Sequence, residues 1–247
     1  METAAELLAA VSLAEPDHAA ALAYYPDDKR AAGLALMAFA AEMRSVPLRV
    51  SEPMLGAIRL QWWREALDEV FGEGRVRAHP LVSALAVTLR EAAHLNPPML
   101  MMIDGTETFF SHADVTGAKA ALDVAAVHDG GLAGGLVALL DPTAELEGWH
   151  KAGAAYGALR ALVRAEPGGR TDIETPTARI ARAPHAEQLR RELLAAFNAA
   201  WTAITPADQA VAPVAAALKS ARTLGQGRRP GMLARRLMQF GTIARGK

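Results

Sequence analysis

Three arginines in predicted helices, Arg44, Arg160 and Arg164, have the clearest chemical potential in this sequence. A guanidinium group donates parallel hydrogen bonds to phosphate or carboxylate oxygens, so these arginines could hold a phosphate directly. Alternatively they are helix-end or surface residues, because a cation in the last turn of any helix is stabilised by the helix dipole. The alternative is favoured for Arg44, which is predicted at a helix end. For Arg160, inside an Ala/Leu-rich segment, both interpretations stay open.

Two Glu-x-x-His motifs, Glu91 to His94 and Glu147 to His150, match the pattern that holds di-iron sites in helical bundles. Such sites need ligands from helix interiors, and these motifs fall near predicted helix ends, so coincidence is the favoured explanation. The remaining histidines lack zinc-ligand spacing, and the chain has no cysteine. No Gly-x-Ser-x-Gly motif indicates a serine hydrolase. These patterns predict no resident metal or cofactor.

The composition argues against several further classes of function and location. The 247 residues carry 26 Lys and Arg against 27 Asp and Glu, a balance that argues against nucleic acid as a partner. The longest apolar stretch, residues 130–140, is shorter than the ~20 residues that span a bilayer. Residues 1–15 have no basic residue ahead of their apolar run, unlike a secretory signal. We expect a cytoplasmic protein whose membrane contact, where it has one, is peripheral and at the inner face.

Helix signals dominate the chain, and strand signals are nearly absent. Alanine and leucine recur throughout, and the prolines suit helix ends. Asp27 can cap a helix that runs to Arg44, before Pro47 ends it; Ser51 can cap a second helix, which Gly72 closes in the left-handed conformation. The pattern predicts an all-α fold in a single domain, residues 1–247. Further helices are predicted at residues 80–94, 96–110, 116–128, 131–140, 143–165, 184–204, 207–224 and 231–245.

The second helix is apolar over much of its circumference. Leu60, Trp63, Leu67 and Val70 recur at helical spacing, which is typical of a buried helix. Large aromatic side chains dominate core packing, so a core position is favoured for Trp63. A ligand-lining position is the alternative.

Residues 226–247 are predicted to form a basic amphipathic C-terminal helix. Its apolar side chains accompany Arg235, Arg236, Arg245 and Lys247, and no acidic residue follows Asp208. Such a helix can lie in a membrane interface or dock on a partner, so residues 231–245 are a candidate peripheral membrane contact. Packing against its own domain is the favoured alternative.

The segment from Phe39 to Gly72 resembles the opening of a squalene/phytoene synthase. Residues 39–53 align with that family's first aspartate-rich helix and the following loop, and residues 63–72 align with its Trp-Arg-x-x-Leu segment. His79-Pro80 and Ile103-Asp-Gly-Thr-Glu107 are similar to two further family patches. The order and spacing of these pieces extend the resemblance over residues 22–165.

The resemblance implies a single isoprenoid-synthase-like helical bundle with a central cavity, where two acidic clusters hold Mg²⁺ against a prenyl diphosphate. The first cluster aligns with Arg44, Ser45 and Leu48, and the metal-binding aspartate of the second aligns with Arg164 or Ala165. One stray glutamate near the first cluster supplies too few ligands for Mg²⁺. The candidate cavity or ligand-binding residues are Glu42, Arg44, Arg59, Trp63, Asp104, Glu107, Arg160 and Arg164.

The patterns Ser51-Glu-Pro53 and Gln61-Trp-Trp-Arg64 resemble a divergent branch of the family that includes assembly factors of respiratory complex I. We therefore expect a non-catalytic binding or assembly protein without a cofactor. Its partner would be an isoprenoid or quinone-like tail, or a client protein. The alternative is a prenyltransferase of the squalene/phytoene synthase type, which acts on prenyl diphosphates and requires Mg²⁺.

Overall fold

The computed structural model describes residues 4–50, 52–108, 115–164, 185–204 and 211–228, and within these ranges it contains helices and no strand. The predicted all-α fold is therefore confirmed. In chain order the described elements are α1 (Ala4–Ala14), α2 (Pro16–Ala21), η1 (Leu22–Tyr24), α3 (Asp27–Arg49), α4 (Pro53–Phe71), α5 (Pro80–Leu89), η2 (Ala93–Leu95), α6 (Asn96–Thr108), α7 (Ala118–Ala125), η3 (Ala126–Gly130), α8 (Gly131–Leu140), α9 (Glu147–Arg164), α11 (Ala186–Ala203), α12 (Ala212–Leu218) and α13 (Ala221–Gly225).

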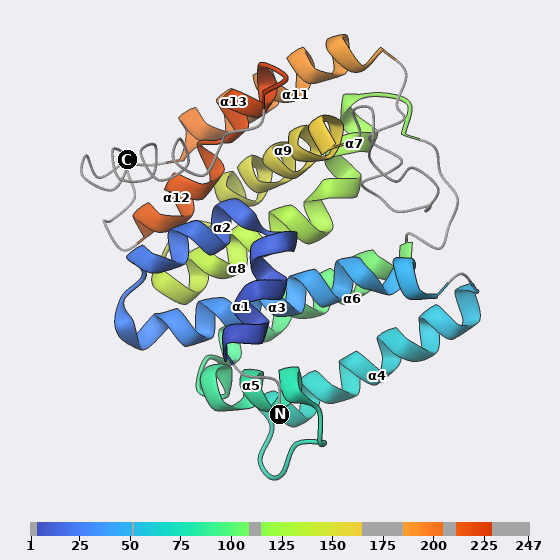
Figure 1. Cartoon of the computed structure of the whole chain (residues 1–247), viewed down its shortest axis with the longest axis vertical. Helices are drawn as coiled ribbons and strands as arrows, with labels where there is room; N and C mark the ends of the chain where they lie inside the picture. The colour runs from blue at the N-terminus through green and yellow to red at the C-terminus, as the bar shows by residue number, and fades with distance from the viewer. Residues whose placement is uncertain (1–3, 51, 109–114, 165–184, 205–210, 229–247) are drawn as a thin grey trace.

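Helix α9 runs through the middle of the bundle (Figure 1). It packs against α11 and α13 on one side and against α7, η3 and α8 on the other. Helix α3 packs against α5, α6 and α8, while α4 lies at the periphery against α5 and α6. The two N-terminal helices cover this assembly, because α1 packs on α3 and α2 packs on α12.

The apolar core is one continuous cluster of buried side chains that extends from α1 to α13. At its α3–α4 side, Phe39 meets the edge of Trp63 with ring centroids 5.6 Å apart, and His79 meets Trp63 at 5.4 Å. Arg77 lies over the ring of Trp62 at 4.7 Å. Edge-to-face ring pairs such as Phe39 with Trp63 each stabilise a fold by about 0.5–1.5 kcal/mol beyond the contribution of their buried area. Trp63 is thus a core residue, the position that the sequence favoured.

Several predicted helix ends are wrong. The helix predicted at residues 80–94 ends at Leu89, and the described part of the helix predicted at 207–224 is divided into α12 and α13. Helix α3 continues through Pro47 to Arg49, because a proline near the last turn removes one hydrogen-bond donor without preventing the bond from Val50 N to Val46 O, at 3.1 Å. Gly72 ends α4 with φ −86° and ψ 178°, an extended conformation and not the expected left-handed one. The residue that precedes Pro53 at the start of α4 is Glu52, which makes no side-chain cap. Ser51 lies outside the described residues.

The predicted helices at 116–128 and 131–140 are continuous. The π-helical turn η3 joins α7 to α8, and such turns are frequent at functional sites. The resulting helix, Ala118–Leu140, is long and apolar enough to cross a membrane by length and composition, which the shorter stretch at 130–140 was not. Of its apolar window, 67% is buried inside the protein, as is usual for the core helix of a folded domain.

Parts of several predictions fall outside the described residues. These are residues 109 and 110 of the helix predicted at 96–110, residues 207–210 of the helix predicted at 207–224, and the basic amphipathic helix from residue 229 onward. The assignment of residues 1–247 to a single domain stays a prediction.

Candidate functional site

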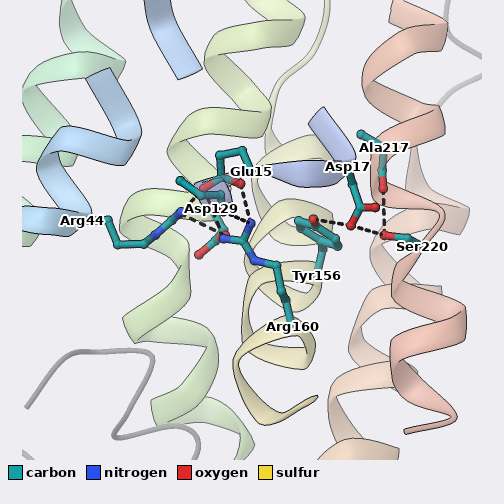
Figure 2. A network of polar contacts seen from close by, with 9 residues as sticks. Glu15, Asp17, Arg44, Asp129, Tyr156, Arg160, Ala217 and Ser220 are labelled. Carbon is teal, nitrogen blue, oxygen red and sulfur yellow. Dashed lines mark hydrogen bonds and ion pairs between the residues drawn. The ribbon is translucent and has the colours of Figure 1, made fainter. Parts of the chain in front are cut away.

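Four buried charged side chains meet at the centre of the bundle and form an ion-pair tetrad of Glu15, Arg44, Asp129 and Arg160 (Figure 2). Arg44 comes from α3, Asp129 from η3, Arg160 from α9, and Glu15 from the bend between α1 and α2. Arg160 donates to Glu15 Oε2 at 2.5 Å and to Asp129 Oδ1 at 2.7 Å. Arg44 donates to Asp129 Oδ1 at 3.2 Å and also to Glu15 Oε1. Each carboxylate is therefore held by two guanidinium groups.

Close packing of η3 against α9 positions Asp129. A Cβ atom at Gly157 would lie 2.1 Å from Asp129 Cγ, and one at Gly153 would lie 2.6 Å from Asp129 O. The absence of side chains at these two glycines lets the acid approach the helix that carries Arg160. The π-helical turn places His128 inside as well, next to Asp129, although consecutive residues of a helix project in different directions.

A second polar group continues from the tetrad toward α12. Tyr156 donates its hydroxyl to Asp17 Oδ2 at 2.8 Å, and Ser220 Oγ lies 3.0 Å from the same oxygen (Figure 2). Arg160 packs over the Tyr156 ring at 5.3 Å from its centroid, so the two groups are contiguous. Burial, with the Asp17 charge, raises the pKa of Tyr156, which keeps this hydroxyl a donor.

The electrostatics favour charged acids and neutral histidines. Burial tends to raise the pKa of Asp129, but Arg44 and Arg160 hold that pKa below its ordinary value. Burial lowers the pKa of His128 to about 3 and that of His18 to about 4, with nearby arginines adding to both shifts. Both imidazoles are therefore neutral at pH 7.

Two further clusters contain the predicted site residues that lie outside the tetrad. Glu42 accepts a hydrogen bond from Arg59 at 2.7 Å and another from Arg49, both partly or largely exposed. On α6, Asp104 and Glu107 both accept from Arg64 of α4, at 2.8 and 2.6 Å, and form an exposed cluster.

Of the eight candidate residues, the structure places Arg44 and Arg160 in the tetrad, Glu42 beside Arg59, Asp104 beside Glu107, and Trp63 in the core. The Arg164 side chain lies outside what the structure describes.

Sequence reasoning missed Glu15, Asp17, Asp129 and Tyr156. For Asp129 a signal was present, since an acid directly before the apolar stretch at residues 130–140 must be paired when it is buried. Glu15 carries no comparable signal, because it follows a helix that is mostly exposed.

The donor set of the tetrad does not fit Mg²⁺. This ion binds carboxylate and water oxygens, whereas the oxygens of Glu15 and Asp129 already accept hydrogen bonds from guanidinium groups. Among the described residues no three His, Asp or Glu side chains are grouped so as to hold a metal ion. The two Glu-x-x-His motifs lie among these residues and form no such group.

A pocket of about 830 Å³ lies on the α9 surface between α7 and α11, away from the tetrad. Its walls are mainly apolar, and alanines of α11 contribute one whole side. None of the eight candidate residues contributes to it. The lining residues are Met101, Leu122, Asp123, Ala126, Val127, Glu147, His150, Lys151, Ala154, Ala196, Ala199, Ala200 and Ala203.

Comparison with known proteins gives one match. Residues 13–126 match the family model described as squalene/phytoene synthase. No curated protein and no solved structure matches the chain. The matched region, somewhat less than half of the chain, includes Arg44 and the motifs of α4 and α6, and it ends before Asp129 and Arg160. Over residues 13–126 the chain is therefore similar to the squalene/phytoene synthase family.

Proposed function

We propose that this chain is a non-catalytic binding protein built on a squalene/phytoene synthase-like bundle. The observation that carries the proposal is the tetrad. Arg44, which aligns with an acid of the first metal-binding cluster, is buried and paired with Glu15 and Asp129. Arg160, from the helix that aligns with the second cluster, pairs with the same two carboxylates. Internal ion pairs thus take up the carboxylates that a metal site would need.

The alternative, a prenyltransferase that holds diphosphate through its arginines, needs an excess of positive charge at the site. A diphosphate carries several negative charges, and these must be compensated for the leaving group to depart. The two arginines of the tetrad are matched by two carboxylates within hydrogen-bond distance. Their charge is therefore already compensated inside the protein, which favours the non-catalytic proposal.

The deciding experiment is incubation with farnesyl or geranylgeranyl diphosphate in the presence of Mg²⁺, with diphosphate release as the readout. We expect release at the background rate. Release above background that is lost in Arg160→Met would overturn the proposal and establish the prenyltransferase alternative. The variant Arg190→Met, in an ion pair with Glu187 on α11 and outside the tetrad, is the matched control for loss of one mostly buried arginine.

For the ligand, we propose an isoprenoid or quinone-like tail in the pocket between α7 and α11. Its volume of about 830 Å³ lies within the ~300–1,000 Å³ of ligand sites, and its apolar walls suit a hydrocarbon chain. Farnesol binding, followed by isothermal titration calorimetry, tests the assignment. Ala199→Phe should fill the pocket and abolish binding. Ala195→Phe, at an exposed position of α11 outside the pocket, should leave binding unchanged.

A client-protein role in respiratory complex I assembly is the second candidate. Apolar side chains of α4 are exposed beside the two sequence patterns that resemble assembly factors, with Met54 75%, Leu55 51% and Ile58 61% exposed. We expect Ile58→Glu to remove co-purification with complex I subunits. Val87→Glu, at an exposed apolar position on α5, should not. Equal recovery of these subunits with both variants would refute a role for this surface.

Peripheral membrane contact through residues 231–245 is a separate proposal. It is tested by co-sedimentation of the full chain with anionic vesicles, compared with a chain that ends at Gly225. Equal co-sedimentation of the two chains would refute it.

A further inference from the structure

The carboxylate of Glu15 lies between the guanidinium groups of Arg44 and Arg160 (Figure 2). Its Oε1 accepts from both arginines, and its Oε2 accepts from Arg160 Nη1 at 2.5 Å. Two arginines that bracket a pair of oxygens form the arrangement by which proteins hold phosphates and carboxylates. Glu15 therefore occupies the place in which a separate oxyanion would bind.

The two arginines belong to the body of the bundle and keep another partner there. Asp129 accepts from Arg44 at 3.2 Å and from Arg160 at 2.7 Å, and none of these three residues comes from the N-terminal helices. Within the tetrad, withdrawal of Glu15 would leave two guanidinium groups against one carboxylate. The surplus positive charge in a buried site would be costly unless another anion replaced the one withdrawn.

The N-terminal segment Ala4–Ala21 buries few large apolar side chains and makes several buried polar contacts. Helix α1 is exposed along most of its length, with Leu13 81% exposed, and Val11 is its one fully buried side chain among those described. The bend and α2 add the carboxylates of Glu15 and Asp17, which bind the arginine pair and the Tyr156 hydroxyl. Polar contacts can be replaced by water or by a competing anion, whereas buried apolar area cannot.

The segment also carries an unsatisfied polar atom. Nδ1 of His18 is buried without a hydrogen-bond partner in the described structure, although the ring packs edge-on against Tyr156 at 5.8 Å. A buried nitrogen without a partner raises the free energy of the docked segment, and water would satisfy it on release. His18 therefore opposes the docking that Glu15 favours.

We propose that α1 and α2 form a removable plug, with Glu15 as the internal oxyanion ligand of the Arg44–Arg160 pair. An external phosphate or carboxylate that binds this pair competes with Glu15 and releases residues 4–21 from the bundle. Binding at this latent anion site is thereby coupled to exposure of the α3 and α12 surfaces that α1 and α2 cover. The inference does not depend on the presence or absence of prenyltransferase activity.

Hydrogen–deuterium exchange on the full chain tests the plug. Inorganic phosphate and succinate are each compared with chloride at matched ionic strength. We expect faster exchange of residues 4–21 with one or both anions and unchanged exchange in α4. Release by phosphate alone assigns the site to phosphate groups, and release by both assigns it to oxyanions in general. Unchanged exchange of residues 4–21 with both anions would overturn the proposal.

Variants sharpen the test through phosphate affinity, measured by calorimetry. Glu15→Gln removes the charge of the internal ligand, so phosphate affinity should rise about tenfold or more. Glu69→Gln removes one acid of an ion pair on α4, away from the tetrad, and should leave the affinity unchanged. Equal affinity of the wild type and a folded Glu15→Gln variant would overturn the proposal. Where that variant does not fold, the exchange experiment on the wild type decides.

Discussion

Two ionic clusters of similar composition lie in opposite environments of this bundle. The tetrad joins two arginines to two acids, and its side chains are at most 13% exposed. The surface cluster joins Arg64 of α4 to Asp104 and Glu107 of α6, and the two acids are 63% and 49% exposed. The two acids of the surface cluster belong to a segment that resembles a family motif. Glu15 and Asp129, at the centre of the fold, belong to no such motif. Resemblance to a family motif therefore does not identify the acids that are buried at the centre of this protein.

The contrast follows from solvation. A buried ion loses its hydration, so removal of one partner from the tetrad leaves a charge that nothing compensates. An exposed ion keeps water as an alternative partner, and salt screens its interactions. The same chemical change should accordingly have very different effects in the two clusters.

The largest effect is expected for Arg160→Met. This variant leaves Glu15 and Asp129 to share Arg44 in a buried site, and loss of one partner from a buried ion pair typically costs about 3–5 kcal/mol. Urea denaturation measures the free energy of unfolding. A cost no greater than that of Arg64→Met would show that burial does not distinguish the two clusters.

The second largest effect is expected for acidification, which should destabilise the region around the tetrad. Both buried histidines have a folded-state pKa, about 4 for His18 and about 3 for His128, that lies below the value of 6.5 in the unfolded chain. The unfolded state therefore binds more protons below pH 6.5, and the free energy of unfolding must fall as the pH drops from 6.5 toward 4. The loss at pH 5 is on the order of 2 kcal/mol for each histidine.

The measurement is urea denaturation at pH 7 and pH 5. His128→Gln should reduce the difference between the two pH values, because it removes one of the histidines whose pKa burial lowers. His185→Asn, at an exposed position, should leave the difference unchanged. An unaltered pH dependence in His128→Gln would contradict the assignment of the effect to that histidine.

Much of the fold was predictable because it depends on local composition. Alanine- and leucine-rich segments became helices, and the predicted apolar stripe of α4, with Leu60, Trp63, Leu67 and Val70, is buried. Helix ends were less predictable, since Pro47 lies inside α3 and Gly72 is extended. The π-helical turn that places Asp129 inside has no recognised sequence signal here.

Sequence patterns could not predict the tetrad. Arg44 and Glu15 are 29 positions apart, Arg44 and Asp129 are 85 apart, and Arg160 and Glu15 are 145 apart. Spacing rules for helices connect residues three or four positions apart, so they cannot pair these side chains. Arg44 and Arg160 could be named as candidate oxyanion ligands, but the carboxylates that they bind could not.

A moderate effect is expected where η3 approaches α9. In Gly157→Ala the new Cβ would lie 2.1 Å from Asp129 Cγ, so the carboxylate or the helix must shift. Overpacking of this kind costs about 1–3 kcal/mol, and displacement of Asp129 would weaken its bonds to both arginines. Gly117→Ala is the control, since nothing lies within 4 Å of its added Cβ. Similar unfolding free energies for the two variants would contradict the proposed constraint on Asp129.

The smallest effect is expected for Arg64→Met in the surface cluster. Its hydrogen bonds to Asp104 and Glu107 are short, at 2.8 and 2.6 Å, but water can replace Arg64 at both exposed acids. Exposed ion pairs contribute about 0–1 kcal/mol, and 1 M salt should remove most of that contribution. The cost of Arg160→Met should change little between low and high salt, because its partners are buried. The dependence of each stability loss on salt concentration, more than the size of the loss, therefore distinguishes the exposed ion pairs from the buried ones.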